Sequence, residues 1–477
     1  DEPPAKIALV ECDAIEDLWD EKFWKAWHER IDEYRINPLR ESHDHVETGP
    51  PPIETKAGWL VMYSYIQYYF GGGKRVFGVE ALLLDKKNPL KIIGKTKGPM
   101  LVPEEIYERY GVVSDVVFPT GTLLHKNGRL DIFYGAADTV VARASVNIND
   151  LLTSLVPKKR LTLVKRYAKN PIIEPVANHP WEEKATFNAG AIDIGGTIRI
   201  LYRAMSLDNT SVIGYAETTN GRTVTKRLPN PIYQPRADFE IKKGSPNGNS
   251  GCEDARLSRI GDTIYMTYTA FDGVNATRIA LSTIPVKDFQ GGRFDKFSMP
   301  ILLSPPGIDD KNMCILPKKI GGSYILFHRI GKQICADYLP DLDFSVTRIN
   351  RCIEIIGPRD GMWDSQKVGI TGPPIETEKG WLLIYHGVSK SMTYRFGALL
   401  LERSNATTVI ARTVDPIFEP TEKYEKEGQV SNVVFSCGVV RRSDTLFIYY
   451  GGADTVLGVA TASVNEILRI LLPKNLP

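Results

Sequence analysis

The chain of 477 residues contains few of the features that identify a function at a glance. Its 59 basic and 57 acidic residues leave a net charge of only +2, and no apolar run approaches the roughly 18 residues that a membrane span needs. The first residues, DEPPAKIALV, lack the pattern of a signal peptide. We therefore expect no nucleic-acid partner, no membrane association and a cytoplasmic location.

Cysteine is scarce as well. None of the six cysteines has CxxC or Cys/His ligand spacing, which argues against a zinc site and predicts reduced thiols. Three motifs are missing: a glycine-rich phosphate loop, a GxSxG nucleophile elbow and a metal-ligand cluster. We predict neither a metal nor a cofactor.

A repeat is the strongest positive feature. About 95 residues at Gly49–Val146 recur at Thr371–Val464, with FGVEALLLD and FYGAADT in the first copy matching FGALLLE and YYGGADT in the second. Both copies close alike, in SVNINDLLTSLVPKK and SVNEILRILLPKN. The repeat predicts a partial unit at 1–157 and a complete unit at 160–477.

From about residue 185 onward, short strand-like runs alternate with Gly, Asn and Asp turns, which predicts an all-β domain. Aromatic strand ends recur at intervals of about 60 residues, which indicates five similar modules and hence a five-bladed β-propeller. The five aromatic positions are Tyr202, Tyr268, Phe327, Tyr385 and Tyr450. Tyr63 and Tyr134 predict two more blades in a partial, propeller-like first unit. Apolar and aromatic residues at helical spacing over 13–35 predict a helix that packs on an exposed surface.

The segment GCEDAR gives the clearest candidate site. Glu253, Asp254 and Arg256 precede a strand, where they form either an acid and anion site or a surface turn with an ion pair. Asn188 in TFNAG and Arg203 in LYRA suit a hydroxyl or phosphate ligand, although a buried arginine brace fits equally well.

Later modules add further candidates at their strand ends. Lys311, beside Asn312, and the pair His328 and Arg329 form a basic cluster on the third module, where solvated charge is the alternative interpretation. The later candidates are His386, Asp454 in GGADT, and Tyr268, which stacks on a sugar or belongs to the core.

Taken together, TFNAG, LYRA, GCEDAR, LFHR, GPPIETEKGWLLIYHG and YYGGADT resemble glycoside hydrolase family 130, the β-mannoside phosphorylases and β-mannosidases. The resemblance implies a five-bladed propeller, with Asp254 as the general acid acting through a hydroxyl of the bound mannose. It also implies phosphate contacts from Arg203, Arg256, Lys311, His328 and Arg329. Sugar contacts are implied for Asn188 and Asp454, and we add Glu253, Tyr268 and His386 as predicted substrate contacts. Ala189 and Ala255 replace prolines of the family's motifs, which affects how the neighbouring side chains are oriented.

These groups favour an inverting phosphorylase that transfers a non-reducing β-mannosyl residue to inorganic phosphate and gives α-mannose 1-phosphate. A hydrolase needs a second carboxyl to activate water, whereas phosphate is already a nucleophile and needs positioning. The partners are then a small β-mannoside and phosphate, with a homo-oligomer as a possibility. A β-mannosidase and a non-catalytic carbohydrate-binding propeller are the alternatives. Asp138 matches Asp454, but the first unit has no counterpart of GCEDAR, TFNAG or LFHR, so we predict that it is not catalytic.

Overall fold

The computed structural model describes residues 6–39, 44–70, 75–155, 163–344, 349 and 351–472. The protein is mostly β and divides into two units. Unit 1 comprises Asp1–Leu161 with Asp360–Met362, and unit 2 comprises Thr162–Arg359 with Trp363–Pro477. The predicted boundary between 157 and 160 lies outside the described residues.

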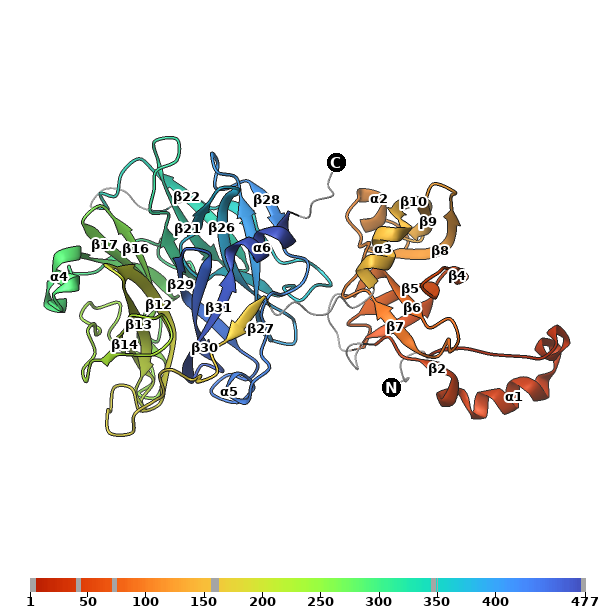
Figure 1. The fold of residues 1–477 in the computed structure, drawn as a ribbon, viewed down its shortest axis with the longest axis horizontal. Coiled ribbons are helices and arrows are strands. Elements are labelled where there is room, and N and C mark those ends of the chain that lie inside the picture. The colour runs from red at the N-terminus through yellow and green to blue at the C-terminus, as the bar shows by residue number, and fades with distance from the viewer. Residues whose placement is uncertain are drawn as a thin grey trace. The chain divides into compact units, whose positions relative to one another are not determined.

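Unit 1 contains two main sheets and a short strand pair (Figure 1). One sheet has the order β3-β5-β6-β7 with β4 beside β5, the other has the order β10-β9-β8, and β1 pairs with β2. The strands are β1 (Ile7–Ala8), β2 (Arg35–Ile36), β3 (His45–Thr48), β4 (Ile53–Glu54), β5 (Trp59–Gln67), β6 (Val76–Leu84), β7 (Ile92–Lys95), β8 (Val117–Leu124), β9 (Arg129–Ala136) and β10 (Val140–Asn147). Its helices include α2 (Ile106–Arg109) and α3 (Ile148–Leu155), and α3 buries Leu151 and Leu155 against the first sheet.

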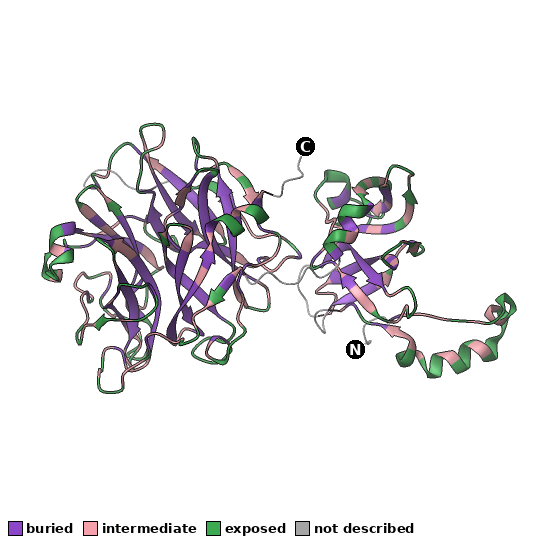
Figure 2. Ribbon diagram, viewed as in Figure 1, coloured by how far each residue is buried: buried purple, intermediate pink, exposed green. Residues whose placement is uncertain are grey.

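The predicted helix over 13–35 is three short helices: η1 (Ile15–Trp19), α1 (Glu21–Glu29) and η2 (Ile31–Tyr34). None of them contains a buried residue, as the green and pink colouring of this segment in Figure 2 shows. Trp19 is 84% exposed. Trp24 and Trp27 pack edge to face on each other. The prediction that this segment packs on a surface is therefore wrong for this chain.

Unit 2 contains five antiparallel groups among its described strands. The first two groups belong to one sheet, since a short parallel pairing of β14 with β16 joins them. This pairing covers two residues of each strand. The groups are β12 (Ala185–Ile194), β13 (Thr197–Met205), β14 (Thr210–Thr218) and β15 (Lys226–Arg227); β16 (Ser250–Ile260), β17 (Thr263–Phe271), β18 (Arg278–Pro285) and β19 (Ile301–Leu302); β20 (Asp310–Ile315), β21 (Tyr324–Ile330), β22 (Gln333–Leu339) and β23 (Ile353–Ile356); β24 (Lys367–Ile370), β25 (Ile375–Thr377), β26 (Gly380–Val388), β27 (Tyr394–Leu401) and β28 (Val409–Arg412); and β29 (Val434–Arg442), β30 (Thr445–Gly452) and β31 (Val456–Ser463) with β11 (Val164–Arg166).

The last group joins the two ends of unit 2, because β11 pairs with β31. Short helices lie at the periphery: α4 (Val286–Gln290), η3 (Phe294–Lys296), α5 (Lys423–Lys426) and α6 (Val464–Leu471). The core lies between neighbouring groups, and Ile200 and Tyr202 of the first pack with Tyr449 and Val459 of the last.

The recurring aromatic positions turn out to brace the groups. In four of the five groups the aromatic residue is a tyrosine whose hydroxyl donates to a buried carboxylate, and an arginine pairs with three of these carboxylates. Buried acids of this kind need such partners. The pairs are Tyr202 with Glu182, Tyr268 with Glu240, Tyr385 with Asp364, and Tyr450 with Glu425. Phe327, which lacks a hydroxyl, holds the same place in the third group.

The prediction of reduced thiols is wrong for one pair of cysteines, because Cys335 on β22 and Cys352 form a disulfide. Cys12, Cys252, Cys314 and Cys437 are free. Among the described helices, none combines the length and hydropathy that crossing a membrane requires.

Candidate active site

Three β-bulges orient polar side chains at the start of the first three groups of unit 2. The pairing register shifts around Asn188 on β12, Asp254 on β16 and Asn312 on β20. All three residues have a left-handed backbone, with φ of +47°, +56° and +60°. Asn and Asp tolerate this conformation better than most residues, and a bulge redirects the side chain that it carries.

The first two bulges bring the central carboxylate and amide together. Asn188 Nδ2 lies 3.1 Å from Asp254 Oδ1, and both residues are buried. The other amide atom, Asn188 Oδ1, is buried without a partner among the described residues. Gly451 leaves the space that this amide occupies, because an added Cβ there would lie 2.4 Å from Asn188 Oδ1.

Arg203 holds the two acidic side chains of the GCEDAR segment. Its Nη2 donates to Glu253 Oε1 at 2.9 Å, its Nη1 lies 3.5 Å from Asp254 Oδ1, and its Nε donates to Ser211 Oγ at 2.9 Å. Lys311 Nζ lies 4.0 Å from the other oxygen of Glu253. The structure thus gathers Asp254, Glu253, Arg203 and Lys311 from three groups.

Arg256 is 1% exposed and serves mainly as a brace. Its two terminal nitrogens donate to the backbone carbonyls of Asp254 and Ile370, each at 2.9 Å. These bonds join the second and fourth groups. Its Nε has no partner among the described residues.

A second basic cluster lies around the third bulge. Arg329 Nε donates to Asn312 Oδ1 at 3.1 Å. Desolvation lowers the pKa of Arg329, and it also lowers the pKa of Lys367, to which Arg329 contributes repulsion. Lys367 Nζ lies 5.1 Å from the ring centre of Tyr394, a typical cation–π distance. Cations whose charge is poorly solvated are suited to bind an anion.

Asp454 and His386 lie at the edge of these clusters. Asp454, with φ of +51°, is in a partly exposed turn. Burial and the neighbouring Asp254 raise its pKa to about 7, in spite of the opposing effect of Arg203. The His386 ring is 4.6 Å from Phe435, and burial holds the pKa of this histidine well below its usual value, so it is neutral.

Two predicted contacts do not fit this geometry. His328 faces away from Arg329, with its ring nitrogens each 3.0 Å from a carboxylate, of Asp310 and of Asp337, so neither nitrogen is left for phosphate. These acids raise the pKa of His328 to about 9. Tyr268 belongs to the core, where its hydroxyl bonds with Tyr233 and Glu240, and its ring is not open to a sugar.

Lys367 and Tyr394 were missed by the sequence reasoning, and Asn312 was noted only as a neighbour of Lys311. The position of Lys367 at a strand end could have identified it in the sequence. Lys367 is the first residue of β24, opposite Val388, and lies just before the second copy of the repeat.

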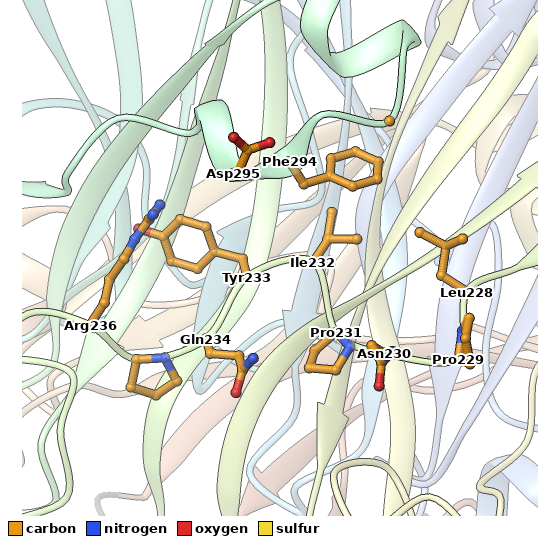
Figure 3. Close-up of a pocket in the computed structure, with 12 residues that line it drawn as sticks. Leu228, Pro229, Asn230, Pro231, Ile232, Tyr233, Gln234, Arg236, Phe294 and Asp295 are labelled. Carbon is orange, nitrogen blue, oxygen red and sulfur yellow. The ribbon is translucent and has the colours of Figure 1, made fainter.

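A surface groove lies elsewhere, next to β15 and η3. It has a volume of about 690 Å³ and is formed by the segment from Leu228 to Arg236 together with Gly292, Phe294 and Asp295 (Figure 3). None of the site residues described above lines it. The candidate site at the bulges and this groove therefore share none of the residues described above.

A family model described as beta-1,4-mannooligosaccharide phosphorylase matches residues 5–156 and, separately, residues 160–472. The chain belongs to glycoside hydrolase family 130. The double match agrees with the repeat found in the sequence.

Individual members of family 130 match about two thirds of the chain. It is 35% identical over 313 residues to the 1,2-beta-oligomannan phosphorylase of Thermoanaerobacter sp. (strain X514), and the match covers 64% of this chain and 98% of that protein. The structure of the beta-1,2-mannobiose phosphorylase from Listeria innocua, in complex with beta-1,2-mannobiose, is 28% identical with a TM-score of 0.55, covering 65% of this chain and 99% of that chain.

A further family 130 structure comes from work stating that the family contains glycoside hydrolases that target beta-1,2 mannosidic linkages in Candida mannan. It is 27% identical with a TM-score of 0.53, covering 65% of this chain and 96% of that chain. The family therefore contains both phosphorylases and hydrolases.

Proposed function

We propose that this protein is an inverting glycoside phosphorylase that transfers a non-reducing β-mannosyl residue to inorganic phosphate. The observation that carries the proposal is the gathering of Lys311, Arg329 and Lys367 around Tyr394, whose hydroxyl is also influenced by the charges of Asp254 and Asp454. Charge-assisted hydrogen bonds contribute roughly 1.5–3 kcal/mol each and would hold a phosphate dianion.

In the proposed reaction, a phosphate oxygen forms a bond to the anomeric carbon of the mannosyl residue from one face. The bond from that carbon to the leaving sugar breaks on the opposite face. The leaving oxygen takes its proton from Asp254, through a mannose hydroxyl as the family resemblance implies. The products are α-mannose 1-phosphate and the shortened sugar.

The roles of the remaining groups follow from their contacts. The unpartnered Asn188 Oδ1 can accept a hydrogen bond from a sugar hydroxyl. Arg203 orients Glu253 and Asp254, and Arg256 fixes the backbone that carries Asp254. Asp454 is proposed to bind mannose hydroxyls, and the neutral His386 to line the same space.

The relatives favour a β-1,2 linkage in the substrate. The curated relative and the solved complex described above are a β-1,2-oligomannan and a β-1,2-mannobiose phosphorylase, although the description of the family model refers to β-1,4-mannooligosaccharides. We propose β-1,2-mannooligosaccharides as the first substrate class.

Hydrolysis is the second candidate, and Asp454 is the observation that favours it. A carboxyl with a pKa of about 7 is suited to act as a general base toward water. Arg329 and Lys367 form no ion pair among the described residues, and Lys311 has only a distant one, at 4.0 Å from Glu253. These three cations would have no function in such a reaction, which is why phosphorolysis is preferred.

We further propose that the five groups of unit 2 are the blades of a five-bladed β-propeller. The first strands β12, β16, β20 and β24 follow one another in contact, and β29 contacts β12, which supports a ring. The pairing of β11 with β31 supports its closure. Unit 1 is proposed to be a partial, non-catalytic counterpart, and the cytoplasmic location stays a prediction.

The deciding experiment incubates the protein with β-1,2-mannobiose with and without phosphate, and detects mannose 1-phosphate by phosphorus NMR. Mannose 1-phosphate that forms only with phosphate is expected. Asp254→Asn should lower this turnover by about 10³-fold, within the range that general-acid catalysis contributes. Release of free mannose without phosphate would instead establish the hydrolase, and sugar binding without any turnover would establish a binding propeller.

A further inference from the structure

One segment of unit 1 can be compared residue by residue with its copy in unit 2, because the two share a hydrogen-bond framework. Glu108 Oε2 accepts the amide hydrogens of Glu104 and Glu105, as Glu425 Oε2 accepts those of Thr421 and Glu422. Thr139 Oγ1 accepts from the Val112 amide at 3.1 Å, as Thr455 Oγ1 accepts from the Gln429 amide at 3.0 Å.

The exposed side chains on this framework differ in polarity between the two units. Unit 1 carries Ile106, Tyr110 and Val112, which are 78%, 72% and 81% exposed. Unit 2 carries three exposed polar residues at the same places, namely Lys423, Glu427 and Gln429. Since the backbone accepts polar residues there, folding does not require the apolar ones, and such a patch is typical of an interaction surface.

A sheet edge lies beside this apolar segment. β10 is the last strand of its sheet, and no described strand pairs with its other side. In unit 2 the equivalent edge of β31 is covered: Leu457 exchanges backbone hydrogen bonds with Ile172 and Ile173, and its side chain is fully buried. Val141, at the corresponding place on β10, is 76% exposed.

We propose that β10 and the apolar segment Ile106–Val113 form a self-association surface that is occupied by the same surface of a second copy of this chain. The two β10 strands pair antiparallel about a twofold axis, and each three-stranded sheet becomes half of a six-stranded one. Twofold pairs of this kind are the commonest form of oligomer, and an edge strand offers the unpaired backbone groups that they need.

Charge complementarity favours one register of this pairing. A pairing centred on Val141 overlaps the two strands over Val140–Ala142 and places Arg143 just beyond this overlap, next to the turn that carries the exposed Asp138 of the second copy. The two Arg143 side chains are then kept apart. Among the described residues of its own chain, Arg143 has one distant ionic partner, Asp131, at 3.7 Å.

The test measures the mass of the full chain in solution by sedimentation velocity over a range of concentrations and at low salt. We expect twice the 53.3 kDa of one chain. Val141→Pro removes an amide that points away from β9, so the pairing with β9 is kept, and the dimer should weaken at least 100-fold. The triple change Ile106→Lys, Tyr110→Glu, Val112→Gln installs the residues of unit 2 and should weaken it at least 10-fold.

Matched control variants distinguish a loss of the proposed dimer interface from a general effect of substitution on the protein. Gln429→Val in unit 2 should leave the dimer unchanged, and so should Arg143→Lys, whereas Arg143→Glu should weaken it about 10-fold. A monomer at all concentrations would overturn the proposal. So would a dimer that resists both Val141→Pro and the triple change, which indicates another interface. The readout does not depend on the proposed activity.

Discussion

The two copies of the repeat have the same strand pairing but different side chains at the strand ends that face the site in unit 2. Lys367 pairs with Val388 at the start of the second copy, and His45 holds this place in the first, opposite Ile66. By the same register, Ser64 holds the place of His386. The scaffold is kept: Tyr134 donates to the buried Glu108 as Tyr450 does to Glu425. The comparison teaches that the bracing network specifies the fold and that a few strand-end residues specify the chemistry.

The largest contrast is expected between the two turn aspartates. Asp454→Asn removes a carboxylate beside Arg203 and Lys367 and should lower kcat/KM by roughly 10²–10³-fold. Asp138→Asn, at the same place in unit 1, should change kcat/KM by less than about twofold. Steady-state phosphorolysis checks both, and equal losses would show that unit 1 takes part in the reaction.

The next largest effect is expected on stability, when the residue paired with the bracing tyrosine is exchanged between the two copies. This tyrosine is Tyr385 in the second copy and Tyr63 in the first. Gly397 packs against Tyr385, and a Cβ there would lie 2.5 Å from the ring, so Gly397→Glu should cost at least about 3 kcal/mol of unfolding free energy. The first copy has Glu80 at this place, where it accepts from the Tyr63 hydroxyl at 2.9 Å. Glu80→Gly should cost only about 1–2 kcal/mol. Urea unfolding measures both, and the reverse order would contradict this interpretation.

The exchange of Lys367 with His45, its counterpart in the first copy, is tested by measuring the affinity for phosphate. Lys367→His installs the residue of the first copy and should raise KM for phosphate by about 10–100-fold, with a smaller effect on KM for the mannoside. His45→Lys should leave both unchanged. An unaltered KM for phosphate in Lys367→His would remove this lysine from the proposed phosphate site.

The smallest effect concerns pH. The pKa of Asp454 is raised from 3.8 to about 7 in the folded protein, so folding is favoured by its protonated form and this contribution is lost as pH rises toward and through 7. Between pH 5 and 8, the wild type should lose roughly 1–2 kcal/mol of unfolding free energy relative to Asp454→Asn. Asp138→Asn is the control, and parallel pH curves for wild type and Asp454→Asn would refute the shift.

Much of this organisation could be predicted from the sequence, since the repeat, the β class and the family resemblance depend on local patterns. The grouping of Asn188 with Asp254 was also predictable, because both belong to motifs at strand starts. The function of the recurring tyrosines was not, since Glu182, Glu240 and Asp364 lie in loops without a common spacing from them.

The wrong prediction for His328 arises because a strand has two faces that point to different surroundings. His328 and Arg329 are neighbours in LFHR, yet alternate side chains point to opposite faces, so one meets Asp310 and the other meets Asn312. Lys367 was missed for a related reason, since it starts a short apolar strand and no motif surrounds it. Sequence neighbours on a strand should therefore not be assigned to one site together.

The three bulges also limit how this site can evolve. Asn188, Asp254 and Asn312 each need a left-handed backbone, which bulky or branched residues enter only at a cost of 1–2 kcal/mol or so. The substitutions available there are essentially amide, carboxylate or glycine. New specificities are then expected to arise at residues such as Lys311 and Lys367, whose backbones accept any side chain, while the chemical nature of the three bulge positions is inherited with the fold.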